Sequence, residues 1–207
     1  MIETDMDTTT GTSLGRPRGF DVDEALERAM VVFWAQGYEG ASLTDLTNAM
    51  GINRTSMYAA FGNKEELFRA ALQRYLNGPG GYAARALQEP TARQVATKFL
   101  LGSIETTTRP NGPTGCLAVQ GSLAAGDAGR PARDALTSCR EEAWSRLRDR
   151  FRQAVDDGDL GPNTDPGLLA RYLLTVSNGI AVQAAGGVDR DDLRLVAEAA
   201  LRNWPPV

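Results

Sequence analysis

Apolar residues recur at helical spacing through most of the chain, and this pattern constrains the fold more than any other feature. The first stretch follows Asp21, a residue type that caps helix N-termini, and ends at Gly37, a residue type that terminates helices. Between them the apolar positions follow i, i+3, i+4 and i+7, and no stretch of the chain alternates as a strand does. The same reasoning predicts further helices over residues 42–50, 53–61, 63–77, 91–109, 116–125, 131–157, 166–185 and 189–203. An all-α fold is therefore predicted.

Composition indicates a globular chain. Hydrophobic residues make up 42% and charged residues 23% of 207 residues, which is enough apolar material for a buried core. No apolar run is long enough to span a membrane. Residues 1–14 lack periodicity and are expected to form a disordered arm, and their acidic character does not fit a signal peptide. A cytoplasmic location is expected.

Several classes of function are excluded by the side chains that the chain lacks. Histidine is absent, which removes His-based catalytic triads and His metal ligands. The two cysteines, Cys116 and Cys139, cannot form a zinc site alone. No nucleophile–base pair or Gly-rich phosphate loop is found, so neither an enzyme nor a cofactor or metal site is expected. The net charge of −4 means that any DNA contact must come from a local patch.

The most informative segment is residues 42–61, where two short predicted helices flank the connection 51–53. Gly51, the first residue of this connection, can adopt the positive φ that ends the first helix. A three-residue connection matches the turn of a helix-turn-helix. Met57 and Phe61, one turn apart, are expected to face inward with Ile52. The second helix would then enter the major groove of DNA. Its outward residues, suited to phosphates and base edges, would be Arg54, Thr55, Ser56, Tyr58 and Ala59.

The stretch from about Phe20 to Leu76 resembles the DNA-binding domain of the tetracycline-repressor (TetR) family. The chain departs from the common family pattern at Ala59 and Ala60, where aromatic or His residues are usual. The resemblance implies a three-helix helix-turn-helix domain over 15–62. It is joined by a helix at 63–77 to a C-terminal helical domain over 63–207 for ligand binding and dimerisation. The matching residues are Ala25, Phe33, Gly37, Tyr38, Ser42, Leu46, Ala49, Gly51, Tyr58, Phe61, Lys64, Leu67 and Phe68.

The resemblance also implies individual DNA contacts, each with a simpler alternative. Arg54, Thr55 and Ser56 begin the recognition helix, and Tyr58 would contact a phosphate or a base, or be partly core. Lys64 would reach the DNA backbone, or be a surface charge paired with Glu65 or Glu66. Ser42 and Thr44 are placed for phosphate hydrogen bonds, although Ser42 has the alternative of being only an N-cap. Arg16 and Arg18 could enter the minor groove or remain solvated.

A dimer is expected, because one recognition helix reads only a few base pairs and useful specificity requires two half-sites. The last two predicted helices carry little charge between Tyr172 and Gly187, which favours packing against a second copy. A core within the single chain is the alternative. The residues predicted for the dimer interface are Leu169, Leu173, Val176, Ile180, Leu193, Val196 and Ala200.

Residues 91–160 are expected to enclose a pocket for a small molecule, and ordinary core packing is the alternative. Cys116 lies at a predicted helix start, where a thiolate is favoured, so it is either a redox or electrophile sensor or a small core residue. The predicted lining residues are Phe99, Ile104, Cys116, Leu117, Leu123, Trp144, Leu147 and Phe151.

The leading hypothesis is a dimeric repressor that binds a pseudopalindromic double-stranded operator and leaves it when an unknown small-molecule effector binds. A repressor that senses oxidants or electrophiles through Cys116 is the alternative within the same family. An all-α enzyme or carrier is the alternative from another class.

Overall fold

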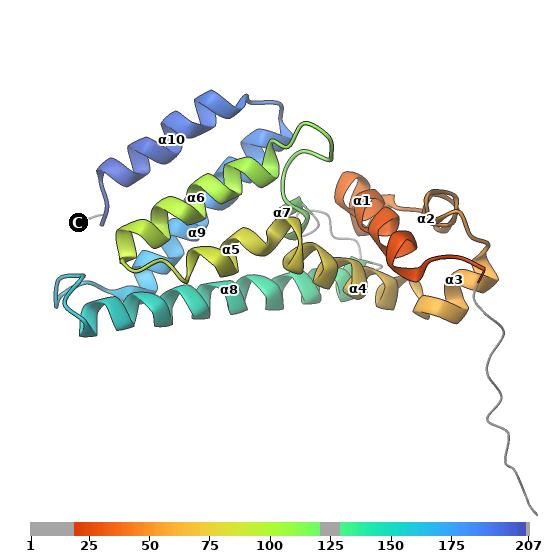
Figure 1. Cartoon of the computed structure of the whole chain (residues 1–207), viewed down its shortest axis with the longest axis horizontal. Coiled ribbons are helices and arrows are strands. Elements are labelled where there is room, and N and C mark those ends of the chain that lie inside the picture. Colours follow the sequence, from red (N-terminus) through yellow and green to blue (C-terminus); the bar gives the residue numbers. More distant parts are fainter. Residues whose placement is uncertain (1–18, 121–128, 206–207) are drawn as a thin grey trace, which may run out of the picture.

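The computed structural model describes residues 19–120 and 129–205, and within these ranges all regular structure is helical (Figure 1). This confirms the all-α prediction. The elements are α1 (Val22–Gly40), α2 (Leu43–Met50), α3 (Arg54–Phe61), α4 (Lys64–Asn77), the 3₁₀ turn η1 (Pro79–Gly81), α5 (Tyr82–Ala86), α6 (Ala92–Thr107), α7 (Leu117–Gln120), α8 (Arg130–Asp156), α9 (Pro166–Ala185) and α10 (Arg190–Arg202).

Helices α1 to α3 form a head at one end of the molecule, and α4 leads from it into the larger helical domain (Figure 1). Asp21 caps α1 as predicted, because its carboxylate accepts hydrogen bonds from the backbone N–H groups of Asp23 and Glu24 at 2.8 and 3.1 Å. The regular helix is interrupted at Gly37, where φ is +70°, and one further turn reaches Gly40. Gly37, which was predicted to end this helix, therefore kinks it instead.

The core of the head combines aromatic side chains from α1 and α4. Phe33 packs edge-to-face against Phe68, with ring centroids 5.1 Å apart, and Tyr38 makes a similar contact with Phe68 at 5.2 Å. Such pairs contribute about 0.5–1.5 kcal/mol each beyond their buried area. The apolar face of α4 belongs to this core, so the helix that was expected to link the two domains packs against the head.

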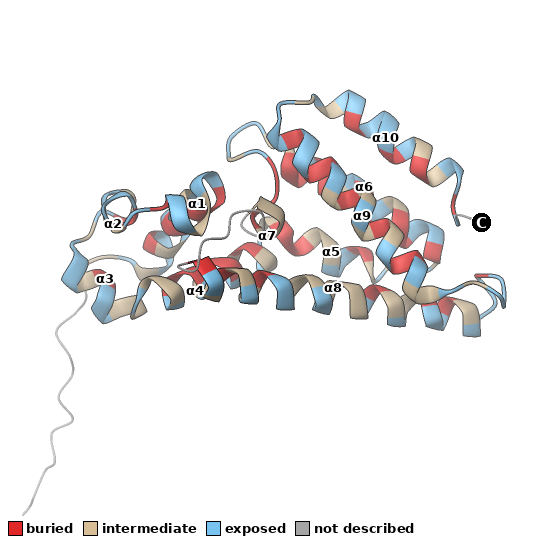
Figure 2. Ribbon diagram, turned by 180° about the vertical axis from the view of Figure 1, so that it is seen from behind, coloured by how far each residue is buried: buried red, intermediate tan, exposed pale blue. Residues whose placement is uncertain are grey.

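The C-terminal domain is a helical layer built on the long helix α8, with α9 and α6 packed beside it and α10 on the outside (Figures 1 and 2). Its core includes Phe99, Phe151, Leu173 and Trp204. Helix α9 has the predicted bounds. Helix α5 was not predicted, because the glycines before it are typical of a loop. Of the predicted helix 116–125, the structure gives α7, and residues 121–128 lie outside the described ranges.

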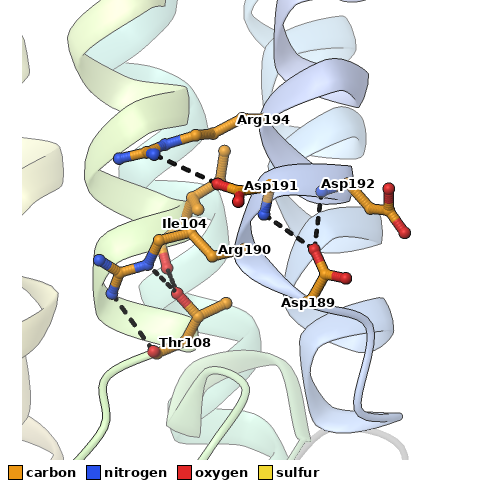
Figure 3. Close-up of polar contacts among 7 residues, drawn as sticks. All are labelled: Ile104, Thr108, Asp189, Arg190, Asp191, Asp192 and Arg194. Atoms are coloured by element: carbon orange, nitrogen blue, oxygen red, sulfur yellow. Dashed lines mark hydrogen bonds and ion pairs between the residues drawn. The ribbon is translucent and has the colours of Figure 1, made fainter.

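Helix α10 is fixed to the end of α6 by polar contacts (Figure 3). The Arg190 guanidinium donates to the hydroxyl of Thr108 at 2.9 Å and to its carbonyl at 3.3 Å. Asp189 caps α10 by accepting from the backbone N–H groups of Asp191 and Asp192, both at 2.9 Å. These contacts hold the start of α10 against α6.

The head is also attached to the larger domain away from α4. The indole Nε1–H of Trp34 in α1 donates to the carbonyl of Gly115, which precedes α7, at 3.0 Å. The same indole ring packs edge-to-face on Tyr75 of α4 at 4.8 Å. Arg109 covers the indole, with its guanidinium carbon 5.4 Å from the ring centroid. The head therefore contacts the larger domain through the segment before α7 as well as through α4.

Candidate nucleic-acid interface

The connection between α2 and α3 has the geometry of a helix-turn-helix. Gly51 ends α2 in the left-handed conformation, with φ +69° and ψ +28°, which a glycine adopts without a Cβ penalty. The backbone N–H of Ile52 then donates back to Thr47 at 3.1 Å. Asn53 begins α3 by accepting a hydrogen bond from the backbone N–H of Ser56 at 2.8 Å. The predicted turn and caps are confirmed.

Helix α3 is anchored by one face and presents the other to solvent. Met57 is completely buried, while Ile52 and Phe61 are partly buried. Arg54, Thr55 and Ala59 are exposed, and 47% of the surface of Tyr58 is accessible. Ser56 is half-buried. Tyr58 is therefore not a buried core residue, although part of its surface is covered by the same chain.

The start of α2 lies beside the start of α3. The guanidinium of Arg54 donates to the hydroxyl of Thr44 at 3.1 Å, which brings two of the predicted DNA contacts together. Ser42 is used differently, because its hydroxyl donates to Asp45 at 2.6 Å and accepts from the backbone N–H of Asp45 at 3.0 Å. These hydrogen bonds lower the pKa of the Asp45 carboxyl. Ser42 is therefore an N-cap in the free protein, as its simpler alternative predicted.

Lys64 lies at the first turn of α4, with its Nζ 4.6 Å from the centroid of the Tyr38 ring. Partial burial lowers the pKa of this lysine, opposed by the charge of Glu39. Glu65 pairs instead with Arg69 at 2.8 Å, and Glu66 caps α4 by accepting from Asn63 at 2.8 Å. The alternative, in which Lys64 pairs with Glu65 or Glu66, is therefore not observed in the structure.

Two further features at this face were missed by the sequence reasoning. The guanidinium group of Arg28, in α1, lies close to the turn. A Cβ atom placed on Gly51 would be 3.5 Å from a guanidinium nitrogen of Arg28. A surface hollow of about 340 Å³ lies between Phe20 and residues of α3 that include Ser56 and Ala59. The chain therefore enters the head beside α3. Arg16 and Arg18 themselves lie outside the described residues.

A cleft is present in the C-terminal domain. A cavity of about 180 Å³ between α4, α5 and α8 shares Ala83, Phe99, Cys139 and Ala143 with an inner cavity of about 80 Å³. Of the predicted lining residues, Phe99 and Leu147 line the outer cavity, and Phe99 and Cys116 line the inner one.

The other predicted lining residues lie elsewhere. Ile104, Leu117 and Phe151 are buried in the hydrophobic cores, so the simpler alternative of core packing applies to them. Trp144 donates from its indole nitrogen to the carbonyl of Gly167 at 3.1 Å, and it does not line either cavity. Leu123 lies outside the described residues.

Comparison with known proteins gives two family matches. Residues 25–71 match the model for bacterial regulatory proteins of the tetR family, and residues 97–200 match the model for a tetracyclin repressor-like C-terminal domain. This chain belongs to the TetR family. Members of this family are transcriptional regulators, and the observed head and C-terminal helical domain are the two parts of the TetR architecture.

Individual TetR relatives match over nearly the whole chain. The HTH-type transcriptional repressor ComR of Escherichia coli (strain K12) is 30% identical over 206 residues, covering 99% of this chain and 98% of ComR. A cysteine mutant of the TetR family regulator CifR, solved with 26-base-pair operator DNA, is 46% identical. The structural match to CifR has a TM-score of 0.88 and covers 92% of this chain and 100% of the CifR chain. A TetR regulator from Rhodococcus sp. RHA1 is 42% identical, with a TM-score of 0.62, covering 88% of this chain and 98% of that chain.

The TetR chain buries most of the side chains that were predicted to contact a second copy. Leu169, Leu173, Ile180 and Leu193 are at most 2% exposed, and Ala200 is 9% exposed. They pack in the core of the same chain and cannot form an intermolecular surface, which corrects the prediction for these five residues. Val176 is partly buried, and Val196 is 50% exposed. The large apolar residues that α9 and α10 do expose are Leu168, Val182, Leu195 and Val196.

Among residues 19–120 and 129–205, no group of His, Cys, Asp and Glu side chains is arranged to hold a metal ion. In the same part of the chain, no helix is both long and apolar enough to cross a membrane.

Proposed function

We propose that this TetR regulator is a repressor that binds double-stranded, pseudopalindromic operator DNA as a homodimer in the cytoplasm. A small molecule bound in its C-terminal domain would release it from the operator. The observation that carries the DNA-binding part is the arrangement of α3, in which buried Met57 fixes the helix while Arg54 and Tyr58 face solvent. The printed names of its relatives, a repressor and a regulator solved with operator DNA, support this proposal.

In the proposed complex, α3 enters the major groove. Arg54 has donors suited to a guanine edge or a phosphate, and Thr55 offers a hydroxyl beside it. Thr44 lies within hydrogen-bonding distance of Arg54, so the two side chains approach the DNA together. Lys64 would contact a phosphate at the edge of the interface.

The proposed dimer uses the outer faces of α9 and α10. Leu168 and Leu195 are 66% and 61% exposed, and Val182 and Val196 are about half exposed. Large apolar side chains on neighbouring helices favour burial against a second copy. Two copies would present two α3 helices, as a pseudopalindromic operator requires.

Release from the operator would follow from the position of α4. This helix contributes Tyr75 and Leu76 to the wall of the inner cavity and also forms part of the head core. A compound that binds one arrangement of α4 more tightly than another shifts the population between them. The thiol-sensing alternative receives no support from the geometry, because burial raises the pKa of the Cys116 thiol and reduces its thiolate fraction.

The test is operator binding by the full chain, measured by footprinting and fluorescence anisotropy on the DNA upstream of its own gene. We expect a protected pseudopalindrome and at least about tenfold weaker binding by Arg54→Ala. Arg152→Ala is the matched control, because Arg152 is an exposed arginine near the end of α8, in the C-terminal domain. Absence of a specific site there and at neighbouring promoters, or equal loss in both variants, would contradict the proposal.

A further inference from the structure

A buried hydrogen bond joins the head to the C-terminal domain by a route that does not pass through α4. The indole N–H of Trp34, in α1, donates to the backbone carbonyl of Gly115, which precedes α7, at 3.0 Å. A buried donor that loses its partner costs the free energy of its desolvation. The head therefore keeps this orientation unless another interaction offsets that cost.

The carbonyl that accepts this bond belongs to a segment that is held by α6, α9 and α10. The backbone N–H of Gly115 donates to the carbonyl of Thr107, at the end of α6, at 2.8 Å. A Cβ placed on Gly115 would lie only 2.9 Å from the Cβ of Ala185, the last residue of α9, so the segment passes directly against that helix. At the other end of the segment, Arg190 of α10 binds Thr108 (Figure 3). The position of the Gly115 carbonyl is therefore set by these three helices.

Helices α9 and α10 also carry the surface proposed for the dimer, which includes exposed Leu168 and Leu195. Helix α3 lies at the end of the head that is away from α7 (Figures 1 and 2). A small turn of the head at its contact with Gly115 therefore displaces α3 relative to this surface. In a dimer, the same turn changes the separation of the two α3 helices.

We propose that Trp34 is a positioning residue for operator recognition, because its bond to Gly115 sets the spacing of half-sites that the dimer accepts. This inference rests on the proposed function, since it needs a dimer that places one α3 helix in each half-site. One base pair added between the half-sites moves them about 3.4 Å apart and rotates one relative to the other by roughly 35°. A head that follows its half-site must then leave its orientation and break the bond.

Removing the Trp34 donor should strengthen binding to an altered spacing. The bond is present in the free chain and is retained on an operator of the preferred spacing, so its loss has no net effect on that affinity. On an altered spacing the bond is broken, and a chain without the donor avoids this cost. One such bond corresponds to about fivefold in an equilibrium constant. A purely structural role of Trp34 would weaken binding to every spacing or leave it unchanged.

The test compares three Trp→Phe variants of the full chain. Trp34→Phe removes the bond between the domains. Trp144→Phe is the matched control, because its indole N–H donates to the carbonyl of Gly167 at 3.1 Å within the C-terminal domain. Trp204→Phe is a second control, since its buried indole nitrogen makes no hydrogen bond with the described residues.

The DNA probes are duplexes with the pseudopalindrome found by footprinting, its spacer unchanged or altered by one base pair, and affinity is measured by fluorescence anisotropy. We expect the unmodified chain to prefer the unchanged spacer by at least about tenfold. Trp34→Phe should reduce this preference about fivefold by binding the altered duplexes more tightly. Both controls should keep the preference of the unmodified chain.

An isosteric replacement separates the lost donor from the smaller ring of phenylalanine. β-(3-Benzothienyl)alanine has sulfur in place of the indole N–H and keeps the two-ring shape. In Trp144→Phe/Trp204→Phe, Trp34 is the remaining tryptophan of the chain, so the analogue enters at this position alone. We expect the same gain for altered spacers as in Trp34→Phe. The analogue decides the outcome if Trp34→Phe loses helical content.

The outcomes separate this inference from the proposed function. If the unmodified chain protects no pseudopalindrome, the proposed function is contradicted and the inference with it. If the chain binds one but accepts all spacers equally, or if the analogue leaves the spacer preference unchanged, only the inference is overturned. The same change of preference in Trp144→Phe, or equal tightening on every duplex when the Trp34 donor is removed, would also overturn it.

Discussion

The phenolic hydroxyl of Tyr75, in α4, donates a hydrogen bond to the sulfur of Cys116 at 3.2 Å, and both side chains are buried. This contact joins the helix that leaves the head to the segment that precedes α7. It also places the Cys116 thiol against an uncharged partner in an apolar surrounding. Burial raises the pKa of this thiol and favours its protonated form, although the hydrogen bond from Tyr75 opposes that shift.

We expect Cys116 to alkylate slowly at neutral pH. Burial raises its pKa, so the thiolate fraction at neutral pH falls below that of a free cysteine and increases only as the pH rises toward the raised pKa. The measurement is iodoacetamide labelling followed by mass spectrometry in Cys139→Ser, where Cys116 is the remaining thiol. Unfolding in guanidinium should remove the protection. Rapid labelling of the folded protein at neutral pH would instead favour the sensor hypothesis.

Gly51→Ala should destabilise the head. Gly51 has φ +69°, and an alanine there is strained, although a Cβ would make only an ordinary contact with Arg28 at 3.5 Å. We expect the free energy of unfolding to fall by about 1 kcal/mol. Gly40→Ala is the control in the same head, since its Cβ would lie 3.6 Å from Gln36 with no positive φ. If denaturant titrations give the same loss of unfolding free energy for both variants, the positive φ of Gly51 is not the cause of the destabilisation.

The two lysines of the chain, Lys64 and Lys98, provide a matched test of phosphate binding. Lys64→Met keeps an apolar stem against Tyr38 and removes the charge, whereas Lys98 lies on α6 and pairs with Glu89 at 3.6 Å. We expect Lys64→Met to weaken operator binding and to reduce the slope of log affinity against log salt by about one for each phosphate that is no longer neutralised. Lys98→Met should leave the slope unchanged. The same change of slope in both variants would argue against a phosphate at Lys64.

Two leucines of α10 should separate the surface proposed for the dimer from the core. Leu195→Glu puts a charge on an exposed face and is expected to produce monomers in sedimentation experiments while the helical content is retained. Leu193→Ala empties a buried site and should lower the free energy of unfolding by about 2–5 kcal/mol. An unchanged dimer in Leu195→Glu would exclude this face as the interface.

The local parts of the structure were predictable because capping residues and glycines act on their own neighbours. Asp21, Asn53 and Asp165 start helices as expected, and Gly51 ends one. The outward residues of α3 followed from the spacing of Met57 and Phe61. These signals depend on residues within one or two turns of each other.

The dimer surface and the cleft were predicted less well, for a physical reason. Helical spacing shows which face of a helix is apolar, but not which neighbour covers that face. Leu169 and Leu193 lie on the predicted apolar stripes and are covered within the same chain, whereas Leu168 and Leu195 remain outside. The lining of a cleft depends on how several helices diverge, and the spacing of residues within one helix does not show this.

The hydrogen bond between Trp34 and Gly115 limits how the head can turn. The head is held both through α4 and through the Trp34 indole, which also rests on Tyr75 at 4.8 Å. Any movement of the head relative to the segment before α7 must therefore break the hydrogen bond between Trp34 and Gly115, whereas a movement that carries this segment along preserves it.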